Sequence, residues 1–96
     1  GDVASYFTYY YVPLLENDMK SGNARSAADR LNDLLATLPT EFKKITTNAQ
    51  LAAWPEKQDL ADYFGAIYLD QGNLYQEAGD TQKANASLEM SRRLKK

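Results

Sequence analysis

Apolar and polar positions alternate with helical spacing from residue 23 onward. Between residues 23 and 38 the apolar side chains recur three and four positions apart, which is typical of an amphipathic helix. Asn23 is a favourable N-cap, Gly22 is suited to end a preceding helix, and Pro39 stops this one. We therefore predict a helix from Asn23 to Leu38. Its apolar face comprises Ala24, Ala27, Ala28, Leu31, Leu34, Leu35 and Leu38.

Two further helices are predicted in the C-terminal half. Pro55 is favoured at the first position of a helix, and Glu56 is favoured near its positive end. Gly79 is suited to end this helix, and Asp80 or Thr81 to cap the next, which runs to a cationic end. The expected apolar faces are Leu60, Phe64, Ile67, Tyr68, Tyr75 and Ala78 in the first of these helices, and Ala84, Leu88, Ser91 and Leu94 in the second.

The rest of the chain also favours helices. We predict one from about residue 3 to 21, kinked at Pro13, and another over about residues 42–54, interrupted near Thr46 and Thr47. Thr47 and Gln50 form a weak capping-box pattern that would restart this second helix. Since period-2 alternation and hairpin turn pairs are almost absent, the predicted fold is all-α, with antiparallel helical hairpins and four to five helices.

Composition narrows the functions that this fold can serve. Ninety-six residues suffice for one domain, and 11 basic against 13 acidic residues give no excess for binding nucleic acid. With no Cys and no His, disulfides, zinc fingers, thiol chemistry and the commonest general base are excluded. The longest nearly apolar run, residues 9–15, is too short to span a bilayer. We expect a non-enzyme that holds no metal or cofactor and does not insert into a membrane.

An internal repeat links the two ends of the chain. When Gly22 is aligned with Gly79, an Ala follows five residues later and a Leu nine residues later in both copies. Residues 72–84 resemble the middle of a tetratricopeptide repeat, with Gly72, Tyr75, the Gly79–Asp80 turn and Ala84. The resemblance implies two units, at about residues 8–41 and 65–96, whose helices pack closely at Gly72 and Ala84.

The spacing of the two units departs from that family. Gly79 follows Gly22 by 57 residues, whereas tetratricopeptide repeats recur every 34 residues, so the segment at about residues 42–54 is an insertion. The alternative is a generic bundle of four or five helices, in which the helical hairpins resemble the repeat without belonging to that family.

A second resemblance covers nearly the whole chain, from Tyr6 to about Leu94. The aromatic stretch, residues 13–16 (PLLE) and the turn at residues 20–23 (KSGN) are similar to the soluble C-terminal region of a family of bacterial multi-pass membrane proteins. The N-terminal half of that family is related to protein O-mannosyltransferases. The resemblance implies a bacterial cell-envelope location and attachment through an upstream membrane portion, which would hold the catalysis. Gly1, which is typical of tag removal, also favours a piece of a longer protein.

Tyrosines are the candidate partner-binding residues. Five aromatic residues fall within residues 6–11, and one core face of a helix cannot accommodate all of them. Because tyrosine is favoured at interfaces, we expect Tyr6, Tyr9 and Tyr10 to bind a partner, together with Tyr63. The alternative is that most of this cluster fills the core, with Tyr6 and Tyr9 at its rim.

Other polar groups favour simpler interpretations. Asp59 and Asp62 share a helix face, but two carboxylates without a further ligand usually form a solvated surface. The basic residues at the C-terminus complement the negative end of the last helix.

Three functions are compatible with these features of the sequence. The chain could be a protein-interaction or scaffolding module that binds a protein or peptide, a soluble tail of a membrane-embedded glycosyltransferase-like protein, or a self-associating homodimer.

Overall fold

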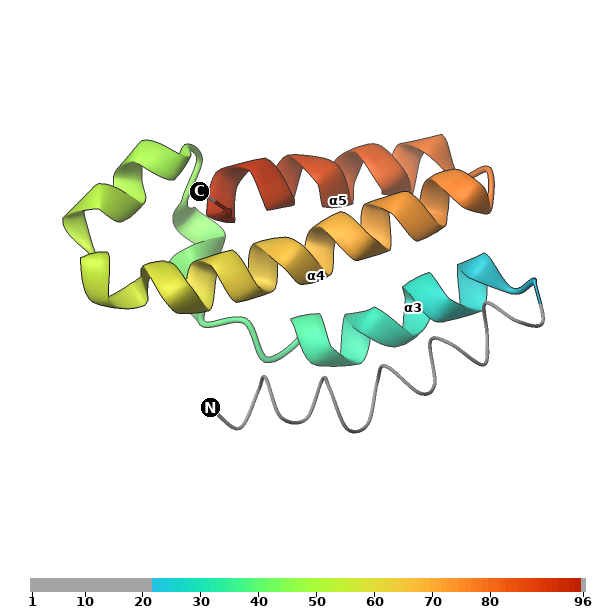
Figure 1. Ribbon diagram of the computed structural model, residues 1–96, viewed down its shortest axis with the longest axis horizontal. Helices are drawn as coiled ribbons and strands as arrows, with labels where there is room; N and C mark the ends of the chain where they lie inside the picture. The colour runs from blue at the N-terminus through green and yellow to red at the C-terminus, as the bar shows by residue number, and fades with distance from the viewer. Residues whose placement is uncertain (1–21, 96) are drawn as a thin grey trace.

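Every element that the computed structural model describes, over residues 22–95, is helical. Helix α4 lies between α3 and α5 and packs against both, and α4 and α5 form an antiparallel hairpin (Figure 1). The predicted all-α class is confirmed, and the described residues contain no strand. The elements are α3 (Ala24–Leu35), α4 (Gln58–Glu77) and α5 (Thr81–Leu94), with three 3₁₀ helices, η2 (Thr40–Lys44), η3 (Asn48–Ala53) and η4 (Pro55–Lys57). The helix predicted over residues 3–21 lies outside the described residues.

Polar caps begin α3 and α5 and a left-handed glycine ends α4 as predicted, whereas α3 ends at Leu35, before the predicted Leu38, and α4 begins at Gln58, after η4. The Asn23 side chain accepts a hydrogen bond from the Ser26 N–H at 3.1 Å, which begins α3. The Asp80 side chain does the same for α5, accepting from the Lys83 N–H at 3.1 Å. Gly79 has a φ of 82°, a conformation that lets the chain turn directly from α4 into α5.

The helix predicted over residues 42–54 is instead two 3₁₀ helices, η2 and η3, separated by residues 45–47. The break falls on Ile45, Thr46 and Thr47, whose β-branched side chains disfavour a continuous helix. The Gln50 side-chain oxygen accepts hydrogen bonds from the N–H groups of Thr46 at 2.6 Å and Thr47 at 3.2 Å. The predicted capping role of Gln50 is therefore confirmed, and it fixes the backbone at the break.

The main hydrophobic core joins the 3₁₀ segment to the α-helices. Phe42 and Leu51 from the 3₁₀ segment pack in one cluster with Phe64 of α4 and Leu94 of α5, all almost fully buried. One predicted core residue is wrong, since Leu60 is 36% exposed. The buried stripe of α4 runs instead through residues three and four apart that begin at Ala61: Ala61, Phe64, Gly65, Ile67, Gln71, Gly72 and Tyr75.

Helices α4 and α5 approach closely at two glycines of α4. A Cβ atom on Gly72 would lie 2.7 Å from Cγ and Cδ2 of Leu88 and 3.3 Å from the carbonyl oxygen of Ala84. A Cβ atom on Gly65, two turns earlier, would lie 2.7 Å from Cβ of Lys95. A side chain at either position would therefore displace Leu88 or the backbone at Lys95. The close contact expected at Gly72 and Ala84 is present.

A buried glutamine connects all three α-helices. Gln71 of α4 is 3% exposed, and its Nε2 donates to the Ala28 carbonyl of α3 at 2.9 Å and to Oδ1 of Asn32 at 2.8 Å. Its Oε1 accepts from the Ser87 hydroxyl of α5 at 2.8 Å. Because both amide protons and the carbonyl oxygen are satisfied, the group stabilises one relative placement of the helices.

A second polar contact joins the same helices near the α4–α5 turn. The Tyr75 hydroxyl donates to Oδ1 of Asp29 at 2.6 Å, and Arg25 pairs with Asp80 at 2.9 Å. Burial, followed by the hydrogen bond to Asp29, raises the pKa of Tyr75 to about 12. The folded state therefore holds the Tyr75 proton more tightly than the unfolded chain, whose tyrosines have a pKa near ~10.

Alkaline pH should weaken the fold through Tyr75. Since the folded-state pKa is the higher one, its contribution to stability is complete below pH ~10 and is lost as pH rises toward ~12. We expect the free energy of unfolding, measured in denaturant across this range, to fall more steeply for the wild type than for Tyr75→Phe, which has no proton to lose. Equal slopes for the two proteins would show that Tyr75 ionises as it does in the unfolded chain.

Candidate protein-interaction site

The 3₁₀ segment lies at the end of α4 away from the α4–α5 turn (Figure 1). A hollow of about 500 Å³ opens on this segment. The break at residues 45–47 separates η2 from η3, and the hollow takes its lining from both of these helices. Its volume lies within the range of ~300–1,000 Å³ that is typical of ligand sites. We call it the Trp54 hollow; its lining residues are Glu41, Lys44, Ile45, Gln50, Ala53 and Trp54.

Trp54 is held in place from two sides. Its backbone N–H donates to the Leu51 carbonyl and its carbonyl accepts from the Lys57 N–H, both at 2.9 Å, so the residue is fixed between η3 and η4. The Lys57 ammonium lies 5.6 Å from the indole centroid and also forms an ion pair with Glu41. A cation at this distance is attracted by the indole ring. Trp54 is half-buried, and these contacts within the chain hold it in place.

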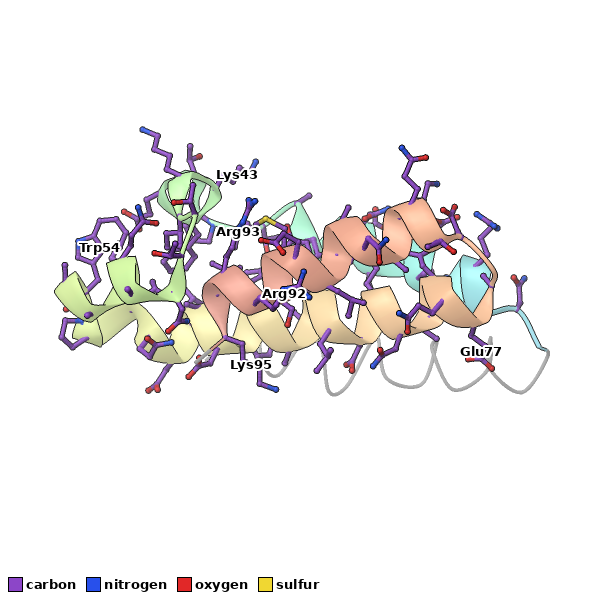
Figure 2. All side chains as sticks on the ribbon, turned by 90° about the horizontal axis from the view of Figure 1, so that it is seen from above. Lys43, Trp54, Glu77, Arg92, Arg93 and Lys95 are labelled. Carbon is purple, nitrogen blue, oxygen red and sulfur yellow. The ribbon has the colours of Figure 1, made fainter. Side chains whose placement is uncertain are left out.

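The lining combines an apolar base with a polar rim. Ile45 is only 3% exposed and reaches the hollow from the core side, while Ala53 is exposed beside Trp54. Lys44 and Gln50 are exposed lining residues. Figure 2 shows Trp54 and Lys43 at this end of the molecule and Glu77 at the opposite end. The arrangement suits one apolar side chain with polar neighbours.

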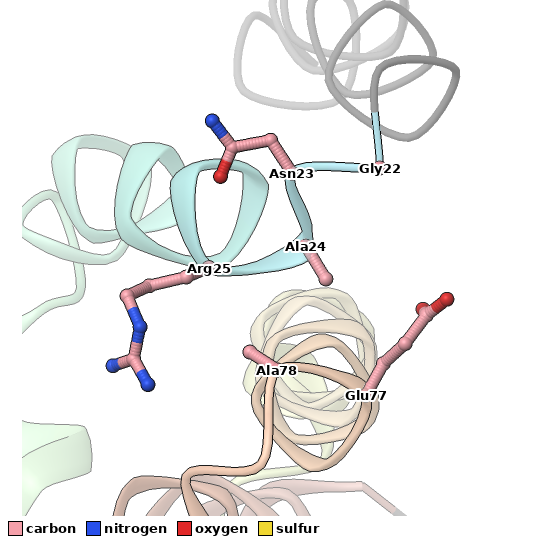
Figure 3. Close-up of a pocket in the computed structure, with 6 residues that line it drawn as sticks. All are labelled: Gly22, Asn23, Ala24, Arg25, Glu77 and Ala78. Atoms are coloured by element: carbon pink, nitrogen blue, oxygen red, sulfur yellow. The ribbon is translucent and has the colours of Figure 1, made fainter.

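The hollow between the start of α3 and the end of α4 is a weaker candidate. It measures about 390 Å³ and includes Arg25 and Glu77, whose side chains point away from each other (Figure 3). The Arg25 guanidinium is already paired with Asp80. Because its charged groups do not converge, this hollow offers no set of groups that would hold one ligand.

Of the tyrosines predicted to bind a partner, only Tyr63 lies within the described residues; Tyr6, Tyr9 and Tyr10 lie outside them. Tyr63 is half-buried on α4 and meets Phe64 edge-to-face, with ring centroids 5.7 Å apart. It packs against the main core, and desolvation raises the pKa of its hydroxyl. Tyr63 therefore covers the core margin and does not line the Trp54 hollow.

Trp54 is not among the site residues that the sequence predicts, and it stands there only at the end of the helix predicted over about residues 42–54. Two signals were present: it is the only tryptophan of the chain, and it lies between alanines and a proline and not within an amphipathic face. The hollow beside it depends on how η2 and η3 are placed, which the sequence pattern does not show.

The charged residues considered from sequence have local roles. Asp62 accepts a hydrogen bond from Gln58 at 2.7 Å, while Arg92 pairs with Glu89 at 2.5 Å and Arg93 with the same carboxylate at 3.4 Å. Residues 22–95 contain no group of three or more His, Cys, Asp or Glu side chains that could hold a metal ion. None of the helices in this part of the chain combines the length and the apolar character of a membrane span.

The fold and the Trp54 hollow define an all-α domain with a preformed surface site. Comparison of the chain with protein-family models, with curated proteins and with solved structures finds no match. The functional argument therefore depends on the site itself.

Proposed function

We propose that this chain is a non-catalytic protein-interaction module that binds a short segment of a partner protein in the Trp54 hollow. The observation that carries the proposal is the placement of Trp54, which is half-buried at the edge of a hollow of about 500 Å³, with the Lys57 ammonium over its ring and Glu41 paired with that ammonium. Tryptophan is among the residues that contribute most to binding at protein interfaces. A side chain that is already positioned loses less conformational entropy on binding.

The helical frame supports this role. The hydrogen bonds of Gln71 join α3, α4 and α5, and the main core continues from these helices to Phe42 and Leu51 under the 3₁₀ segment. The hollow therefore lies on a packed support. A rigid helical frame that presents side chains to a partner is also what the tetratricopeptide-like pattern implies.

Selection from a random peptide library, displayed on phage, tests the proposal. We expect enriched peptides that bind the wild type and bind Ala53→Gln at least about ten-fold more weakly, because the longer side chain occupies the hollow. Ala52→Gln is the matched control, since Ala52 is equally exposed but does not line the hollow. Both alanines are exposed, so neither change disturbs the core.

Two results would contradict the proposal. One is a selection that enriches no peptide over a protein-free control. The other is a set of peptides that bind wild type, Ala53→Gln and Ala52→Gln equally well, because binding would then occur elsewhere on the molecule.

A further inference from the structure

One lysine of the Trp54 hollow, and a second that precedes it in the chain, carry positive charge without an ion-pair partner among the described residues. Lys44 lines the hollow and Lys43 precedes it on η2; both are exposed, and neither has an ion-pair partner among residues 22–95. Glu41 is the other charged lining residue, and its carboxylate is paired with Lys57, which lies outside the lining.

The acidic residues that follow in the chain lie outside the lining of the hollow. Glu56 and Asp59 lie on η4 and the start of α4, and neither lines the hollow. The Lys44 side chain therefore borders the apolar lining residues Ile45, Ala53 and Trp54. Complementary charge at the rim of an interface steers association and selects the partner.

We propose that the occupant of the Trp54 hollow is an acidic peptide segment with one large apolar side chain. This inference rests on the proposed function and adds the chemistry of the partner. The apolar side chain packs against Ile45, Ala53 and the indole of Trp54, while flanking Asp or Glu residues lie near Lys43 and Lys44. Charged rims and apolar centres are the usual arrangement of protein interfaces.

The peptides that depend on Ala53 reveal whether this chemistry is correct. We expect their sequences to be richer in Asp and Glu than the starting library and to share one large apolar position. The best of them should change the fluorescence of Trp54, which is the only tryptophan of the chain and therefore reports on the hollow alone when the peptide contains none.

A charge reversal then tests the lysines directly. Lys44→Glu should weaken binding of that peptide at least about five-fold at low salt and less at high salt, because salt screens charges at a rim. Lys83→Glu is the matched control: it makes the same change of charge on α5, where glutamate near the N-terminus is favourable for the helix. We expect it to leave binding unchanged.

Each other outcome has a distinct meaning. Neutral or basic peptides whose binding depends on Ala53 would contradict the acidic chemistry of the partner but not the proposed interaction function. Equal effects of Lys44→Glu and Lys83→Glu on binding would have the same meaning. A selection without Ala53-dependent peptides would overturn both. A dimer in light scattering that Ala53→Gln dissociates would show that a second copy of the chain is the occupant instead.

Discussion

Replacing Gly72 by leucine should lower the free energy of unfolding by more than ~2 kcal/mol, because the site where α4 meets α5 has no room for a side chain. Even a Cβ atom would lie 2.7 Å from Leu88 and 3.3 Å from the Ala84 carbonyl oxygen. A leucine side chain can be placed there only by displacing Leu88 or by moving one helix away from the other. Denaturant unfolding followed by circular dichroism measures the loss.

Two further variants separate overpacking from helix propensity. Asn73→Leu places the same side chain at the next, exposed position of α4 and should change stability by less than ~0.5 kcal/mol. Adding Leu88→Ala to Gly72→Leu removes the nearest side-chain atoms and should restore part of the loss. A Gly72→Leu protein as stable as the wild type would show that α4 and α5 are not in close contact at this turn.

Replacing Gln71 by methionine should lower the free energy of unfolding by about 2 kcal/mol. Methionine fills a similar volume but has no donor and only a weak sulfur acceptor, which leaves the buried Ser87 hydroxyl without its amide acceptor and Asn32 without its donor. A buried polar group without a partner costs ~1–3 kcal/mol. The wild type and the variant are compared by denaturant unfolding at neutral pH.

A double-mutant cycle tests whether the loss comes from the hydrogen bond. Ser87→Ala together with Gln71→Met should cost less than the sum of the two single changes, because removing both partners leaves no orphaned group between them. Gln76→Met, at an exposed position of the same helix, is the control for the change of residue type and should be near neutral. Additive losses would mean that Gln71 and Ser87 do not interact.

The sequence predicts those parts of the fold that local chemistry determines. Asn23, Gly79 and Asp80 act within one helical turn, so their roles at the helix ends can be derived from residue type alone. The close packing at Gly72 was also predicted, because the repeat pattern places small residues on facing helices.

Other features depend on contacts between segments that are distant in the chain. Gln71 looks like a surface residue in the sequence, yet it is buried because Ala28 and Ser87 supply its partners from 43 and 16 residues away. The Trp54 hollow likewise results from how η2 and η3 are placed on either side of the break between them. The sequence pattern predicts the position of this break but not the relative placement of the two 3₁₀ helices. Leu60 continues the apolar pattern of α4 but lies outside the stripe that packs.

The most direct test of the interaction site is a map of backbone and indole N–H chemical shifts, recorded by NMR as the best selected peptide is added. We predict the largest shifts at the Trp54 indole and among residues 41–57, with α3 and the α4–α5 turn unchanged. Shifts concentrated around Tyr63 or on α3, with Trp54 unaffected, would contradict the assignment of the hollow as the binding site.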